Sequence, residues 1–166
     1  MRPLALVGSG LLAISVLPVP GRAQVDGPTA LPALSFLVGE WQASGTGEPG
    51  RSIGTFSFHW AAAGHAVIRY NEAATPSGLH SDVMLIYAEG DSIRATYTDS
   101  EGHVIDYLVT ATPTPHRAVF ESAGPGVRYR LWYELRRDSS LATGFQVAAP
   151  GAGDFRTYLE GVARRR

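Results

Sequence analysis

Apolar and polar residues alternate along most of this chain, and the alternation has a period of two. The segment VRYRLWYEL (127–135) is the clearest case. In an extended strand its apolar face is formed by Val127, Tyr129, Leu131, Tyr133 and Leu135. In TFSFHW (55–60), aromatic residues occupy every second position in the same way. From Gly39 onward no window keeps apolar residues at helical spacing, so the pattern predicts an all-β protein.

Ten segments rich in β-branched and aromatic residues follow one another: 39–45, 55–60, 66–73, 82–88, 93–98, 104–112, 117–122, 127–135, 141–148 and 155–162. The Gly-, Pro- and Asp-rich stretches between them have the length of hairpin turns, and none could hold the helix of a parallel crossover. We therefore predict a single antiparallel up-and-down β-barrel of about ten strands, because closure removes the exposed edges of a long meander. A flat β-sandwich is the alternative.

The first part of the chain has the pattern of a signal peptide (residues 1–23). Arg2 precedes the apolar stretch 4–17, and small residues stand at 21 and 23. An uncleaved membrane anchor is the other interpretation, but the apolar run is shorter than the roughly 20 residues that span a bilayer. We expect an exported protein, periplasmic or secreted, with a lead-in segment at 24–33 and one barrel domain at 34–166.

The absence of Cys and the slightly negative net charge exclude several classes of protein. The chain has no Cys, so neither a disulfide framework nor a lipid-modified cysteine is possible. Removing residues 1–23 takes away Arg2 and Arg22 and leaves 12 basic against 15 acidic residues, a net charge of −3. That balance provides no basic surface for nucleic acid or for an anionic membrane, and we expect no stable membrane insertion of the mature chain.

The stretch FLVGEWQASGTG (36–47) raises the question of what Gly39-Glu40-Trp41 does at the start of the first strand. Gly39 allows a tight bend after a short turn at 34–38, and Trp41 would then close one end of the barrel. This opening resembles that of the calycin superfamily, which includes the lipocalins and nitrobindin-like barrels. With YTDSEGHV (97–104) and YLEGVARR (158–165), it is more closely similar to bacterial lipocalin-like barrels of unknown function. The resemblance implies that Trp41 packs against an Arg of the last strand, here Arg164 or Arg165.

The nitrobindin-like branch binds haem, and the chain shares its FLVGEW…GTG opening. That branch continues into a Tyr-Pro-Thr-Ile type segment, where this chain has EPGRSI (48–53). It also places a haem-ligating His in the last strand, where this chain has Tyr158. With both features lost, we expect no haem and no other cofactor.

Catalytic and metal motifs are weak. Five His residues are present, and His80 and His103 would lie in turns at the same end of the barrel, with Asp82 and Glu101 as the nearby acids. A metal site needs three or four ligands with carboxylate support, so we interpret these His as solvated loop residues and predict no metal site. The segment PSGLHSD (76–82) lacks the sharp elbow of a nucleophile, and we predict no catalytic residues.

The barrel interior is the candidate site. Taking the more apolar face of each strand as inward gives the expected ligand-binding residues Phe56, Phe58, Tyr70, Tyr97, Tyr107, Tyr129 and Tyr133. No Asp, Glu or Arg clearly falls on that face. The mouth would be ringed by the turns at 47–51, 75–80, 99–102, 123–126 and 149–154, opposite the end closed by the N-terminal segment. We expect reversible binding of a small apolar molecule rather than an enzyme activity.

Two alternatives stay open. In a barrel enzyme of isomerase, cyclase or hydrolase type, an inward Tyr or His would act, and His59 or Asp106 would be the best candidates if the predicted faces are wrong there. In a structural or partner-binding barrel, the aromatic residues would fill the core and an apolar patch would lie outside.

Overall fold

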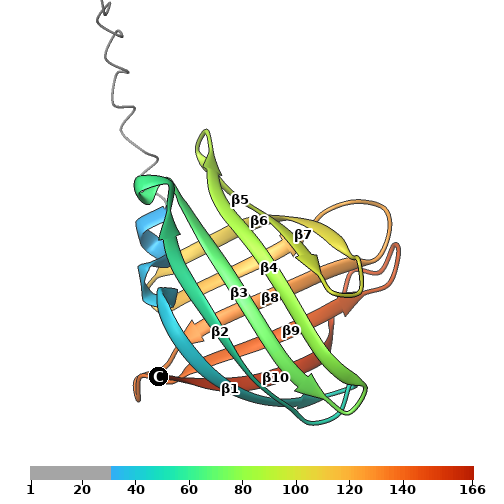
Figure 1. Ribbon diagram of the computed structural model, residues 1–166. Helices are drawn as coiled ribbons and strands as arrows, with labels where there is room; N and C mark the ends of the chain where they lie inside the picture. Colours follow the sequence, from blue (N-terminus) through green and yellow to red (C-terminus); the bar gives the residue numbers. More distant parts are fainter. Residues whose placement is uncertain (1–30) are drawn as a thin grey trace, which may run out of the picture.

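The computed structural model describes residues 31–166, and they form one closed antiparallel barrel (Figure 1). The predicted signal peptide and most of the predicted lead-in segment lie outside the described residues. Within residues 31–166, no helix is long and apolar enough to cross a membrane.

Ten strands follow one another around the barrel, and each pairs with its neighbours in sequence. The first and last strands pair with each other and close the ring, with Trp41 opposite Arg165. The elements are η1 (Leu31–Leu37), β1 (Gly39–Gly47), β2 (Ser52–Ala61), η2 (Ala62–Gly64), β3 (Ala66–Thr75), β4 (Gly78–Glu89), β5 (Ser92–Asp99), β6 (Val104–Pro113), β7 (His116–Ser122), β8 (Arg128–Leu135), β9 (Leu141–Ala148) and β10 (Arg156–Arg165).

The predicted architecture is confirmed. All ten expected segments form strands, and most extend a few residues further than the pattern indicated, because the hairpins are tighter than their Gly and Pro content suggested. The sandwich alternative is wrong, since β1 and β10 are hydrogen-bonded and the sheet has no free edge.

One end of the barrel is closed by η1, which lies at the left of Figure 1. Leu31, Leu34 and Leu37 are buried on its inner side, so residues 31–33, at the end of the predicted lead-in segment, take part in closing the barrel. Phe36 reaches the turn between β6 and β7, where its ring stacks on His116 with 5.6 Å between the ring centroids.

Trp41 is the large stopper that the sequence suggested. Its indole is fully buried, and Nε1 donates a hydrogen bond of 2.8 Å to the carbonyl oxygen of Leu37. The guanidinium of Arg165 lies 4.5 Å from the centre of the indole and donates to the carbonyls of Val38 and Phe36. The predicted Trp–Arg contact is therefore confirmed, with Arg165 as the partner.

One strand, β3, turns a different face inward than predicted. In β3, Val67, Arg69 and Asn71 point inward, whereas Tyr70 is 51% exposed on the outer surface. The inward assignment of Tyr70 is wrong because β3 has apolar residues on both faces, and hydrophobicity alone does not choose between them. In β4, Asp82 and Met84 are buried while Val83 is exposed.

Candidate functional site

The barrel encloses a cavity of about 550 Å³ that opens at the end opposite η1. Its rim includes residues of the turns at 47–51, 75–80 and 99–102, which confirms this part of the predicted mouth. These turns lie on the side of Figure 1 away from η1. The interior is therefore not filled by side chains, and the alternative in which the aromatic residues fill the core is wrong.

Five of the seven predicted ligand-binding residues line this cavity: Phe56, Tyr97, Tyr107, Tyr129 and Tyr133. Phe58 is fully buried in the packed core, where its ring meets Phe56 and Tyr133 edge-on. Tyr70 lies outside the barrel. Their shared role in holding a ligand stays a prediction.

Inside the cavity lies an ion pair that the sequence analysis did not expect. Arg69 of β3 and Asp82 of β4 are each 6% exposed, and Arg69 Nη1 donates to Asp82 Oδ1. Asn71 Nδ2 donates to the other carboxylate oxygen at 2.9 Å. The prediction that no Asp or Arg faces inward is thus wrong. Asn71 is directly opposite Asp82 in the β3–β4 ladder, which places the pair on the inner face.

Burial works against the charge on Arg69, but attraction to the Asp82 carboxylate outweighs it, and the pKa of the guanidinium is raised. Burial also raises the pKa of the Tyr133 hydroxyl, although nearby Arg69 pulls it down. A charged pair away from water persists only when each partner is compensated. The pair is therefore a fixed pair of opposite charges on the cavity wall, with Asp82 toward the mouth.

Two polar atoms beside this pair have no hydrogen-bond partner in the described part of the chain: Arg69 Nε and the hydroxyl of Tyr133. Both are buried, and both residues line the cavity. A buried polar group without a partner costs about 1–3 kcal/mol. Such groups are rare in folded proteins, and here they are where a ligand would satisfy them.

The mouth holds a second polar group of side chains. His80 Nε2 is 3.2 Å from Asp82 Oδ2, and His80 Nδ1 is 2.8 Å from Glu101 Oε2. The hydrogen bond to Asp82 raises the pKa of the His80 imidazole against the effect of burial, and the Asp82 and Glu101 charges add to the rise. The interpretation of His80 as a solvated loop residue is wrong.

Asp99 organises the turn that follows β5. Its Oδ1 accepts hydrogen bonds from the backbone N–H groups of Glu101 and His103, and its Oδ2 accepts one from Tyr97 at 3.1 Å. Burial raises the pKa of this carboxyl, but the bonds from the His103 backbone and side chain outweigh it and lower the pKa. The turn is fixed with its side chains facing β4.

The two residues named for an enzyme alternative face away from the cavity. His59 is exposed, and exposed Asp106 accepts a hydrogen bond from Thr96 on the outer surface. The predicted parity of β2 and β6 holds at these positions. An enzyme that uses His59 or Asp106 inside the barrel is therefore not supported.

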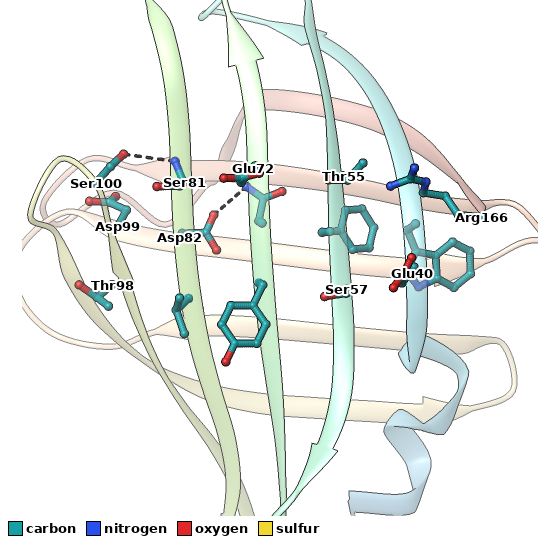
Figure 2. Close-up of a pocket in the computed structure, with 15 residues that line it drawn as sticks. Glu40, Thr55, Ser57, Glu72, Ser81, Asp82, Thr98, Asp99, Ser100 and Arg166 are labelled. Carbon is teal, nitrogen blue, oxygen red and sulfur yellow. Dashed lines mark hydrogen bonds between the residues drawn. The ribbon is translucent and has the colours of Figure 1, made fainter.

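A second hollow of about 640 Å³ lies on the outer face of β1 to β5 (Figure 2). Its labelled side chains are mostly short and polar, among them Thr55 and Ser57 on β2. The backbone N–H of Ser81 on β4 donates to the hydroxyl of Ser100, in the turn after β5. Buried Asp82 borders this hollow as well as the interior cavity, but its partner Arg69 and the tyrosines Tyr97, Tyr107, Tyr129 and Tyr133 line the interior cavity and not the hollow. We therefore take the interior as the candidate site.

Neither a protein-family model nor a curated protein matches the chain. Among solved structures, the S-type phycobiliprotein lyase CPES from Guillardia theta is similar, with a TM-score of 0.50 and 8% identity over 80% of this chain and 90% of that chain. EF1p2_mFAP2b, solved bound to DFHBI, gives a TM-score of 0.46 with 12% identity over 83% of this chain and all of that chain. A de novo designed fluorescence-activating β-barrel gives 0.45 with 13% identity over 81% of this chain and 97% of that chain.

At 8% identity the likeness to the lyase shows the fold alone, and no argument is drawn from the two structures with lower TM-scores. The function has to be argued from the cavity of this chain.

Proposed function

We propose that this protein reversibly binds a small, largely aromatic or aliphatic molecule inside the barrel. The observation that supports this best is the open cavity of about 550 Å³, which ends at two buried polar atoms without partners. Apolar walls with a few convergent polar groups are typical of small-molecule sites. Export, predicted from residues 1–23, stays a prediction.

The polar atoms narrow the ligand class. Arg69 Nε–H can only donate a hydrogen bond, and the Tyr133 hydroxyl can donate or accept one. A ligand that satisfies both carries an oxygen acceptor, such as a carbonyl or phenolic oxygen, at its buried end. The rings of Tyr97, Tyr107 and Tyr129 would enclose its apolar body. The proposed ligand is therefore apolar along most of its length and polar at one end.

A cavity-filling substitution tests the proposal. Thr143 lines the cavity on β9, and Thr143→Phe would occupy the space that a ligand needs. Thr110 is exposed on the outer face of β6, so Thr110→Phe adds the same side chain outside. We would titrate parent and variants with palmitate, retinol and quercetin by isothermal calorimetry.

We expect at least one of these probes to bind the parent saturably, with one-to-one stoichiometry. The control variant Thr110→Phe should bind that probe as the parent does. Thr143→Phe should weaken that binding by at least about tenfold, a loss of about 1.4 kcal/mol. Absence of saturable binding to any probe, or equal binding by Thr143→Phe, would overturn the proposal. Thermal unfolding of each variant establishes that a loss of binding does not reflect loss of the fold.

A further inference from the structure

Five titratable side chains gather at the cavity mouth, although they come from different parts of the hairpin sequence. β4 contributes His80 and Asp82, β5 ends at Asp99, and the following turn contributes Glu101 and His103. One ligand atom each from His80, Asp99 and Glu101 lie within 4.8 Å of one another. Nitrogen and carboxylate oxygen donors at this spacing are what a bound divalent ion requires.

The backbone fixes this arrangement. Asp82 is directly opposite Asp99 in the β4–β5 ladder, so the two side chains lie next to each other on the same face of the sheet. The N–H of Ser100 donates to the carbonyl of Ser81, which ties the turn to β4. The hydrogen bond from the Glu101 backbone to Asp99 turns Glu101 back toward His80. His80 and Asp99 are therefore held by strands, and Glu101 is held by a turn that is hydrogen-bonded to β4 and to Asp99.

The hydrogen-bond pattern around His80 leaves a place for a cation. A neutral imidazole has one N–H, yet each ring nitrogen of His80 faces a carboxylate. Asp82 is buried and fixed by Arg69, so it is the acceptor for Nε2–H. Nδ1 and the Glu101 carboxylate therefore face the same point, 2.8 Å apart, where they can share one cation, either a proton or a metal ion.

This is the arrangement of a metal-ligating histidine whose second nitrogen is held by a carboxylate. Here the support extends one step further inward, because Asp82 is itself paired with Arg69 in the barrel. Asp99 is supported in the same way by the hydroxyl of Tyr97 and by Nδ1 of His103. The groups behind two of the three donors are thus already in position.

Charge supports the same conclusion. Around the described cavity three carboxylates, Asp82, Asp99 and Glu101, stand against the single guanidinium of Arg69. The three carboxylates exceed the guanidinium by two negative charges, the number that one divalent cation carries as positive charge. One imidazole with carboxylates suits a borderline ion such as Zn²⁺ better than Ca²⁺, which prefers oxygen donors alone.

We propose that the mouth of the barrel binds a divalent transition-metal ion of the zinc type through His80 Nδ1, Asp99 and Glu101. A water molecule or a group of the barrel ligand would complete the coordination, since catalytic and ligand-exchanging zinc sites keep one position open. The site does not depend on the proposed interior ligand, and the two proposals can fail separately.

The test is calorimetric titration of the metal-free, untagged protein with Zn²⁺, without any organic ligand. We expect one-to-one binding and a rise in the thermal unfolding midpoint at saturation. His80→Asn and Glu101→Gln should each weaken binding by more than about tenfold. Glu101 is exposed, so its substitution leaves the fold intact even if His80→Asn does not. His65→Asn, at the closed end, is the matched control and should bind as the parent does.

Absorption of the Co²⁺-loaded protein provides a second readout, because visible bands report a tetrahedral site directly. The proposal is overturned if Zn²⁺ produces no stoichiometric heat. It is also overturned if His80→Asn and Glu101→Gln both bind as tightly as the parent. If Zn²⁺ produces no stoichiometric heat, His80 is protonated on both ring nitrogens and donates to Asp82 and Glu101 without a metal ion.

Discussion

At the scale of single residues, Tyr133 has two parts with different roles: its ring packs in the core, and its hydroxyl faces the cavity. Arg69 and Thr143 lie close enough to influence its ionisation, but neither meets it with hydrogen-bond geometry. The tyrosine ring, in contrast, packs against Phe56, Phe58 and Phe120. The ring contributes to folding, and the hydroxyl is left for another partner.

We therefore expect Tyr133→Phe to leave the free energy of unfolding of the ligand-free protein within about 1 kcal/mol of the parent, or slightly higher. The control is Tyr97→Phe, since the Tyr97 hydroxyl donates to the carboxylate of Asp99. Loss of that bond should cost about 1.5–3 kcal/mol. Urea unfolding at neutral pH measures both values.

If Tyr133→Phe proves as destabilising as Tyr97→Phe, the Tyr133 hydroxyl is paired in solution and the argument for an acceptor on the ligand fails. If only Tyr97→Phe destabilises, the Tyr133 hydroxyl is free for binding. The two variants remove the same atom from the same residue type, so the comparison isolates the partner.

At the scale of elements, the join between η1 and β1 depends on one glycine. Gly39 has a φ of +129°, a conformation that L side chains rarely adopt. A Cβ at this position would overlap Nη1 of Arg165, the group that holds the carbonyls of Val38 and Phe36. The Gly-x-Trp opening is therefore required by the closing of the barrel end.

We expect Gly39→Ala to lower the free energy of unfolding by about 2–4 kcal/mol, from backbone strain and from displacement of Arg165. Gly64 also has a positive φ, of +91°, but nothing lies within 4 Å of a Cβ there. Gly64→Ala should therefore cost only the strain, about 1–2 kcal/mol. Equal losses in urea unfolding would show that the guanidinium contact adds nothing.

The elements themselves could be predicted from the sequence, because a period of two and hairpin-sized turns constrain each strand locally. The faces of β8 were predictable too, since three of the four residues on the other face, Arg128, Arg130 and Glu134, are charged. In β3 this criterion fails, because Ile68 and Tyr70 make the outer face as apolar as the inner one. The choice of face there depends on a partner strand, which local hydrophobicity does not include.

The inward position of Arg69 and Asp82 could have been predicted from the pairing of β3 with β4, but not from either strand alone. Folding the chain about the turn between Thr75 and Gly78 places Asn71 opposite Asp82. Arg69 shares the face of Asn71, and His80 shares the face of Asp82, so all four polar residues gather on one side. The metal-type cluster needs one further step, because Glu101 turns back through backbone bonds that no periodicity indicates.

At the scale of the whole molecule, the barrel protects three phenols from ionisation. Burial raises the pKa of Tyr97, Tyr107 and Tyr133 above the ordinary value of 10. In the unfolded chain these phenols would ionise near that value, while in the folded chain they stay protonated to higher pH. Their contribution to stability is therefore complete below pH 10 and is lost as the pH rises through the folded pKa values.

We expect absorbance titration of the folded protein to show three fewer tyrosinates near pH 11 than titration in concentrated urea. The free energy of unfolding should fall steadily above about pH 10. A folded protein that ionises all seven of its tyrosines by pH 11 would contradict this protection.

The seam between β1 and β10 sets the order in which such a chain can assemble. Every other ladder joins strands that are neighbours in sequence, but this one brings together the two most distant strands. Remote pairing carries the largest loss of chain entropy, so the ring closes last. Until it does, β1 and β10 each present an open edge of the same register. The β1 edge of one copy can pair with the β10 edge of a second copy in the same way as with its own. A domain-swapped dimer is therefore the form of misfolding that this topology favours most.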